Sequence, residues 1–128
     1  NSLEWGGDSM KDCARIPAVT EMDRHHCCWP KRQGWNVGYA HLICQAFVRY
    51  VPIVHHRELH AKMKGVPIPP AHLLRAAWEK YQADKDKIDR YDVCRACAWL
   101  YVNIPDTDFR KAMQYQIDFF VTKMGRSS

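Results

Sequence analysis

The stretch that decides the fold is VPIVHHRELHAKMKGVPIPP, residues 51–70. It begins with a short β-branched run, Val51–Val54, which contains a proline and suits an edge strand or an extended turn. A short helix is expected over His56–Lys64, and Gly65 would stop it. The proline-rich exit must be extended, because each proline disfavours helix in the residue before it. The stretch therefore predicts a strand or turn, then a helix, then a stiff connector.

Helical patterns lie on both sides of this stretch. Residues 37–50 repeat apolar side chains at helical spacing. After the connector, three more helices are expected: one from residue 70 or 71 to about 84, one to about Asn103, and one that Asp106 caps and Gly125 closes. The charged segment 85–92 would start the second of these helices or continue the first. Residues 10–36 are irregular, with a short strand around Ala18–Met22.

Composition sets broad limits on the class of protein. The net charge of +5 is mild, so it permits nucleic-acid binding without demanding it. No apolar run is long enough to cross a bilayer, and no secretion signal is visible, so we expect no membrane partner. An intracellular, cytoplasmic protein with reduced cysteines is favoured over a secreted disulfide scaffold.

Five of the seven histidines form two clusters. His25 and His26 form the first, and the second spans His55–His60. His56 and His60 are four residues apart, so on a helix both rings project from one face and can bind one divalent ion. His25 is the natural third ligand. His26 faces differently, and its ordinary pKa suits a general base acting on water.

The expected cofactor is a divalent metal, either zinc or magnesium or manganese. Such an ion would stabilise the charge that develops on a phosphodiester and its leaving oxygen. Asp23 and Glu58 are the carboxylates nearest these imidazoles along the chain. Both are candidates for orienting the rings through hydrogen bonds.

The order of these motifs resembles the HNH (His-Me finger, ββα-metal) endonucleases, and most closely a subgroup of small phage-associated HNH-like proteins. The resemblance covers residues 21–75. It is carried by Arg24–Arg32, Phe47–Val54, Arg57–His60 and Val66–Pro70. It implies a ββα element in which a His pair follows the first strand and metal ligands lie on the following helix.

Two positions depart from that pattern. The family usually places an Asn in the second strand, and Val51–Val54 contains none. Lys64 stands where the subgroup has a second helical His, and His56 is the candidate to replace it. The residues therefore leave two alternatives open: a metal-dependent nuclease, or a scaffold descended from one that binds without cleaving.

The combined expectation is an α+β, mainly α fold in one domain. Residues 1–9 would be a flexible N-terminal extension or a cloning remnant. Residues 10–69 would form the HNH-like ββα element with an inserted helix. Residues 70–128 would add two or three antiparallel C-terminal helices to the same domain.

The cysteines admit two interpretations. Cys94 and Cys97 have the spacing of a metal or redox pair, but they lie in the apolar helical stretch 93–102, where buried core residues are favoured. The rival is a structural zinc site that joins them to Cys27 and Cys28.

Two further features concern partners. Lys31 and Arg32 beside Trp29 suit a phosphate backbone and a stacked base, although Trp29 could equally anchor a solvated loop in the core. The apolar stripe from Phe109 to Met124 is most simply core, and is otherwise a homodimer seam.

The leading prediction is a divalent-metal-dependent HNH-like endonuclease, or a nuclease-derived DNA-binding protein, of phage or mobile-element type. His26 would be its base, and DNA its partner. The alternative is a non-catalytic phage regulator or inhibitor that binds a host protein. Its metal or cysteine site would serve only stability.

Overall fold

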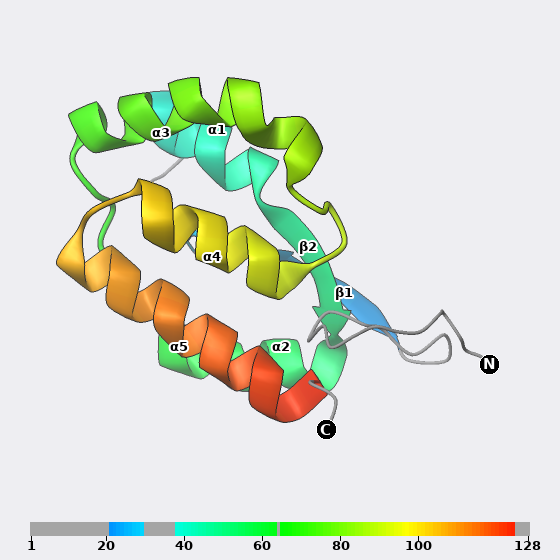
Figure 1. Cartoon of the computed structure of the whole chain (residues 1–128). Coiled ribbons are helices and arrows are strands. Elements are labelled where there is room, and N and C mark those ends of the chain that lie inside the picture. The colour runs from blue at the N-terminus through cyan, green and yellow to red at the C-terminus, as the bar shows by residue number, and fades with distance from the viewer. Residues whose placement is uncertain (1–20, 30–37, 64, 125–128) are drawn as a thin grey trace.

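A computed structural model describes residues 21–29, 38–63 and 65–124 of the chain. Helices dominate it, and the described strands form one two-stranded antiparallel sheet, which confirms the α+β, mainly α fold class (Figure 1). The elements in chain order are β1 (Met22–His26), α1 (Gly38–Ala46), β2 (Val48–Pro52), α2 (Ile53–Met63), α3 (Ala71–Asp84), the 3₁₀ turn η3 (Lys85–Lys87), α4 (Val93–Asn103) and α5 (Thr107–Met124).

The sheet has an inner and an outer face. In its register His25 lies opposite Arg49, and Arg24 lies opposite Tyr50. Successive side chains of a strand point to opposite faces. His25 and Arg49 accordingly lie on the buried inner face, whereas Arg24 and Tyr50 lie on the exposed outer face.

The strands do not begin where the sequence predicts. β1 starts at Met22, where the expected strand would end, so the His pair lies on a strand; residues 18–20 lie outside the described part of the chain. The helix expected over 37–50 ends at Ala46, and β2 follows it. The helical spacing does not extend the helix through residue 50, because Val48 and Tyr50 suit a strand and β1 supplies the partner strand.

Helix α2 starts earlier than expected, directly after the proline that ends β2. The fixed φ of Pro52 suits the entrance of a helix, where a missing N–H costs little. The backbone N–H of Ile53 donates to the carbonyl of Glu21 at 3.1 Å. This bond ties the start of α2 to the residue that precedes β1.

The C-terminal helices follow the sequence closely. The predicted bounds of α3 and the predicted end of α4 at Asn103 are confirmed, whereas α4 begins only at Val93. The N–H of Phe109 donates to the Asp106 carboxylate at 2.9 Å, which confirms that cap. The segment 85–92 differs, because only Lys85–Lys87 is helical. Asp92 instead caps α4 by accepting from the N–H of Arg95 at 3.0 Å.

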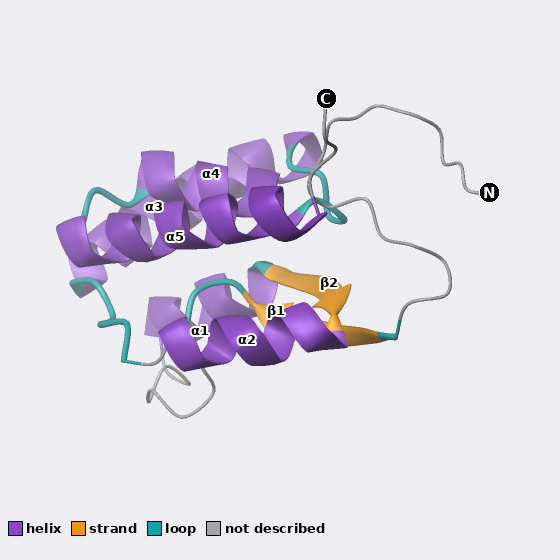
Figure 2. Ribbon diagram, turned by 90° about the horizontal axis from the view of Figure 1, so that it is seen from below, coloured by secondary structure: helices purple, strands orange, loops and turns teal. Residues whose placement is uncertain are grey.

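The elements form two layers, with α3, α4 and α5 above the sheet, α1 and α2 (Figure 2). Helix α5 packs along α2, and Lys123 and Glu58 form an ion pair of 3.3 Å between them. The stripe of α5 faces the chain's own core, where Phe109, Met113 and Phe120 are buried. This part of the stripe is therefore core, and the homodimer stays a prediction. None of the described helices combines the length and the apolar composition that crossing a membrane requires.

Candidate metal centre

Strand β1 and helix α2 bring the two His clusters together. The ring centroids of His25 and His56 lie 5.2 Å apart, and those of His56 and His60 lie 4.5 Å apart. All three side chains line one cavity of about 300 Å³, which His26 and Arg24 also border. Imidazoles that are about thirty residues apart along the chain thus share one site.

One nitrogen of His25 has a hydrogen-bond partner and the other has none. Nε2 of His25 lies 2.6 Å from Oε1 of Gln116, and Nε2 of Gln116 donates to the carbonyl of Cys27 at 2.7 Å. That second bond orients the amide, so its oxygen must accept and the Nε2–H of His25 must donate. Nδ1 of His25 then carries the lone pair, and it is buried without a partner.

The burial of His25 keeps its ring neutral. Its side chain is only 4% exposed. Burial lowers the pKa of His25 from 6.5 to about 3, the hydrogen bond that His25 donates to Gln116 opposes this, and His56 and His60 lower it further. A neutral imidazole with an unpaired lone pair is the form that binds a metal ion.

His56 has the complementary arrangement. Its Nδ1 lies 3.1 Å from Oδ2 of Asp23, the carboxylate that the sequence suggested as an orienting partner. A carboxylate only accepts, so Nδ1–H donates and Nε2 carries the lone pair of the neutral ring. Nε2 of His56 is also buried without a hydrogen-bond partner. A carboxylate on the far nitrogen of an imidazole is the usual support of a metal-binding histidine.

The donor set is incomplete as it stands. Within the described ranges, no three His, Cys, Asp or Glu side chains are arranged to hold a metal ion together. His60 is exposed, unlike His25, and its ring packs edge-on against His56. The site therefore offers two buried donor atoms beside an exposed third imidazole.

Sequence reasoning missed Gln116. It lies on α5, which the family resemblance does not cover, yet it fixes the tautomer of His25. A signal was present, since Gln116 is a polar residue within the apolar stripe, three residues after Met113 and four before Phe120. A buried amide in such a stripe must have hydrogen-bond partners.

The four cysteines expected to bind zinc differ in oxidation state. Cys27, Cys28 and Cys97 are buried free thiols, whereas Cys94 is disulfide-bonded. The hydrogen bond with Cys27 and burial raise the pKa of the Cys97 thiol, and burial raises that of Cys28. Protonated thiols in an apolar core match the core interpretation. Because Cys94 is disulfide-bonded, it has no thiolate to offer a zinc ion, so the predicted four-cysteine site is not formed in this structure.

The expected nucleic-acid contacts are only partly described. Trp29 has no exposed surface, and its ring packs against Phe109 at 6.0 Å between centroids. Its Nε1 donates to the carbonyl of Pro67 at 3.4 Å. Trp29 is therefore a core anchor that holds the connector rather than a platform for a base. Lys31 and Arg32 lie outside the described residues.

Comparison of the chain with protein-family models, with curated proteins and with solved structures finds no match.

Proposed function

We propose that the chain is a divalent-metal-dependent phosphodiesterase of HNH type that acts on DNA. The observation that carries the proposal is the pair of buried, unpartnered nitrogens, Nδ1 of His25 and Nε2 of His56. Leaving a buried polar atom without a partner costs about 1–3 kcal/mol. Two such atoms on rings 5.2 Å apart are explained if both bind one cation.

His25, His56 and His60 are the proposed ligands. Gln116 and Asp23 hold the first two rings in the tautomers that binding requires. His60 would complete the set, because its ring lies beside that of His56 at 4.5 Å between centroids. When bound, the ion would stabilise negative charge on the phosphodiester and its leaving oxygen.

His26 and Arg24 are the proposed residues that act on the substrate. His26 ends β1 and borders the same cavity as the ligands, so it can accept a proton from an attacking water. Arg24 lies two residues earlier, on the same face of the strand, and borders that cavity too. Its guanidinium would hold a phosphate oxygen of the strand being cleaved.

The proposed setting is the interior of a host cell, with a phage or mobile element as the origin of the chain. Its support is the sequence resemblance. The cysteines do not decide the compartment, because four of those described are buried free thiols and Cys94 is disulfide-bonded.

A non-catalytic function is the second candidate, and one observation favours it. Gln116 joins His25 to the carbonyl of Cys27, so this network links α5 to the end of β1 without a metal. His25 would then be a structural core residue, and the chain would act by binding a host protein.

Two measurements separate these candidates. Purified protein is incubated with plasmid DNA and magnesium, manganese or zinc, and nicked or linear products are quantified. The proposal expects cleavage that His26→Ala abolishes and that the matched control His72→Ala retains, since His72 is exposed on α3 and does not border the cavity. Bound metal, measured by atomic emission, should fall in His56→Ala and persist in His26→Ala. Absence of both cleavage and bound metal would leave the non-catalytic candidate.

A further inference from the structure

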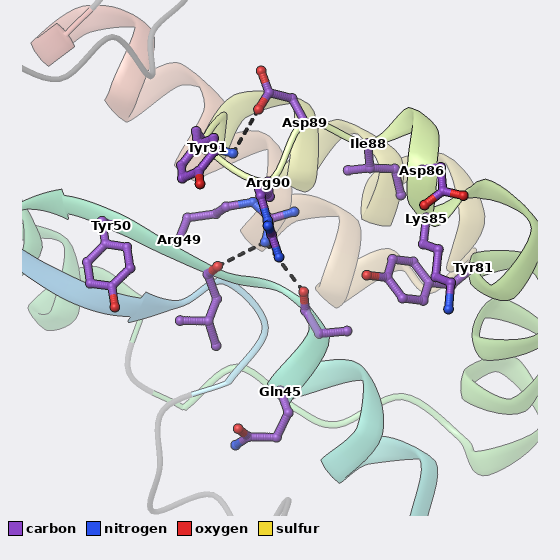
Figure 3. A pocket seen from close by; sticks show the side chains of 12 residues that line it. Gln45, Arg49, Tyr50, Tyr81, Lys85, Asp86, Ile88, Asp89, Arg90 and Tyr91 are labelled. Atoms are coloured by element: carbon purple, nitrogen blue, oxygen red, sulfur yellow. Dashed lines mark hydrogen bonds between the residues drawn. The ribbon is translucent and has the colours of Figure 1, made fainter.

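A second, larger cavity lies between β2, the end of α3 and the segment 85–91. Its volume is about 770 Å³, within the range of small-ligand sites. β2 contributes Arg49 and Tyr50, α3 contributes Tyr81, and the segment after α3 contributes Lys85, Arg90 and Tyr91. Figure 3 shows the arginine side chains in the middle, Tyr50 and Tyr91 to the left, and Tyr81 and Lys85 to the right.

Arg49 is a buried cation that has no anionic partner within residues 21–29, 38–63 and 65–124. It is 5% exposed, and its Nη1 donates to the carbonyls of Val48 at 2.9 Å and Ala46 at 3.4 Å. Its Nε is buried with no hydrogen-bond partner, and no carboxylate among the described residues forms an ion pair with it. Burying a charge in this way is costly unless something pairs with it.

The groups that surround Arg49 within the core do not supply that pairing. The thiols of Cys28 and Cys97 are close enough for Arg49 to lower their pKa, but burial outweighs this effect and both pKa values are raised. Both thiols therefore stay neutral. The ring of Phe47 lies under the guanidinium at 5.7 Å, which offsets part of the cost but adds no negative charge.

The remaining charges of the cavity favour an anion modestly. Three basic residues against Asp86 and Asp89 leave a net charge of +1. Asp89 accepts from the backbone N–H of Tyr91 at 2.8 Å, so that carboxylate stabilises the turn. In Figure 3 the carboxylate of Asp89 lies at the top and that of Asp86 at the right beside Lys85, both away from the guanidinium of Arg49. The two arginines thus lie in the middle of the cavity, whereas both carboxylates and Lys85 lie toward its edges.

We propose that this cavity binds a nucleotide through its phosphate, with Arg49, Arg90 and Lys85 as the phosphate ligands and a tyrosine ring against the base. Planar guanidinium groups match phosphate oxygens, and aromatic rings stack on any base. Tyr50 and Tyr91 are both more than half exposed, and the guanidinium of Arg90 lies over the Tyr91 ring at 6.0 Å from its centroid. The inference goes beyond the nuclease proposal, because it requires neither a metal nor the His cavity.

The experiment measures binding in the full chain with a chelator present, so that no metal contributes. A fluorescein-labelled oligothymidylate reports affinity by anisotropy, and thymidine monophosphate, thymidine and inorganic phosphate compete with it. The monophosphate should compete, while thymidine should compete at least about tenfold more weakly, as loss of a charged hydrogen bond implies. Equal competition by thymidine and its monophosphate would overturn the phosphate site. Equal competition by inorganic phosphate would overturn the stacked base.

Variants assign the binding to this cavity. Arg90→Gln and Lys85→Gln are exposed substitutions that should fold normally, and each should weaken binding by about tenfold. The matched control Arg75→Gln removes an exposed arginine of α3 that pairs with Glu79, and should leave affinity unchanged. Arg49→Gln should abolish binding, with circular dichroism checking its fold.

Two outcomes would overturn the assignment. One is unchanged affinity in both Arg90→Gln and Lys85→Gln. The other is a loss in His56→Ala as large as theirs, because that would place the ligand in the His cavity. Failure of plasmid cleavage would leave the proposed cavity unaffected, since its test contains no metal.

Discussion

Oε1 of Gln116 accepts from Nε2 of His25 at 2.6 Å, across 91 residues of sequence. The bond joins α5 to β1 and sets which nitrogen of His25 carries the proton. Both side chains are buried, so neither can use water instead. The C-terminal helix thereby determines the chemistry of a histidine that sequence reasoning assigned to the N-terminal element alone.

Replacing the amide should cost substantial stability. Gln116→Leu leaves two buried groups unpaired, the Nε2–H of His25 and the carbonyl of Cys27. At about 1–3 kcal/mol for each such group, the free energy of unfolding should fall by about 2–6 kcal/mol. Urea denaturation measures the loss. Gln114→Leu is the control, because Gln114 is exposed and bonds only Asp118, and a loss no larger than the control's would contradict the role of the network.

The metal-free protein should lose stability as the pH falls through the range between 6.5 and about 3. The pKa of His25 is lowered from 6.5 to about 3 in the folded state, so between these values only the unfolded state holds the proton. Stability then rises with pH, by about 1.4 kcal/mol per pH unit in the middle of that window.

Urea denaturation with a chelator at several pH values tests this dependence. His25→Asn removes the titrating ring and should flatten the slope between pH 6 and 4. The carboxylate of Asp23 and the rings of His56 and His60 also face His25, and they stay in both proteins. Parallel slopes for His25→Asn and the unmodified chain would show that His25 does not titrate as described.

Added zinc should stabilise the fold through the His cavity. A ligand that binds only the folded state at a hundred times its Kd adds about 2.7 kcal/mol. Thermal unfolding with and without zinc should show a rise in Tm that is lost in His56→Ala and kept in His72→Ala. A rise that survives in His56→Ala would place the ion elsewhere, for example at the cysteines.

The N-cap of α5 should contribute measurably by itself. Asp106→Ala removes the carboxylate that accepts from the N–H of Phe109, and such losses cost about 1 kcal/mol. Asp108→Ala is the matched control, since Asp108 is exposed in the first turn and makes no cap bond. Chemical denaturation should show a clearly larger loss for Asp106→Ala, and equal losses would mean that the cap adds nothing.

The local sequence pattern was insufficient to predict where the strands begin and end. Helical spacing continued through Val48 and Tyr50, yet these residues pair with β1, because a strand forms only where another segment offers its hydrogen bonds. The bounds of α3 and the end of α4 were predicted without such a conflict. These boundaries depend on neighbours in the chain, such as Pro70 and Pro105.

In the candidate site, too, some features could be predicted from the sequence and others could not. The spacing of His56 and His60 already placed both on one helical face, and Asp23 was a correct candidate partner for His56. Trp29 was misassigned to nucleic acid, since its burial against Phe109 depends on where α5 packs. Arg49 was not singled out, because its sequence neighbours do not reveal that it is buried.

The sequence by itself determined the α+β class, the C-terminal helices with the Asp106 cap, and the pairing of two histidines on α2. These features depend on contacts between residues a few positions apart, and the regular repeat of a helix or strand fixes the geometry of such contacts. Only the tertiary structure decided that Gln116 orients His25 and that Arg49 is buried beside a cavity. The hydrogen-bond partners and the burial of these side chains depend on how segments remote along the chain pack together. The spacing of residues within one segment does not indicate that packing.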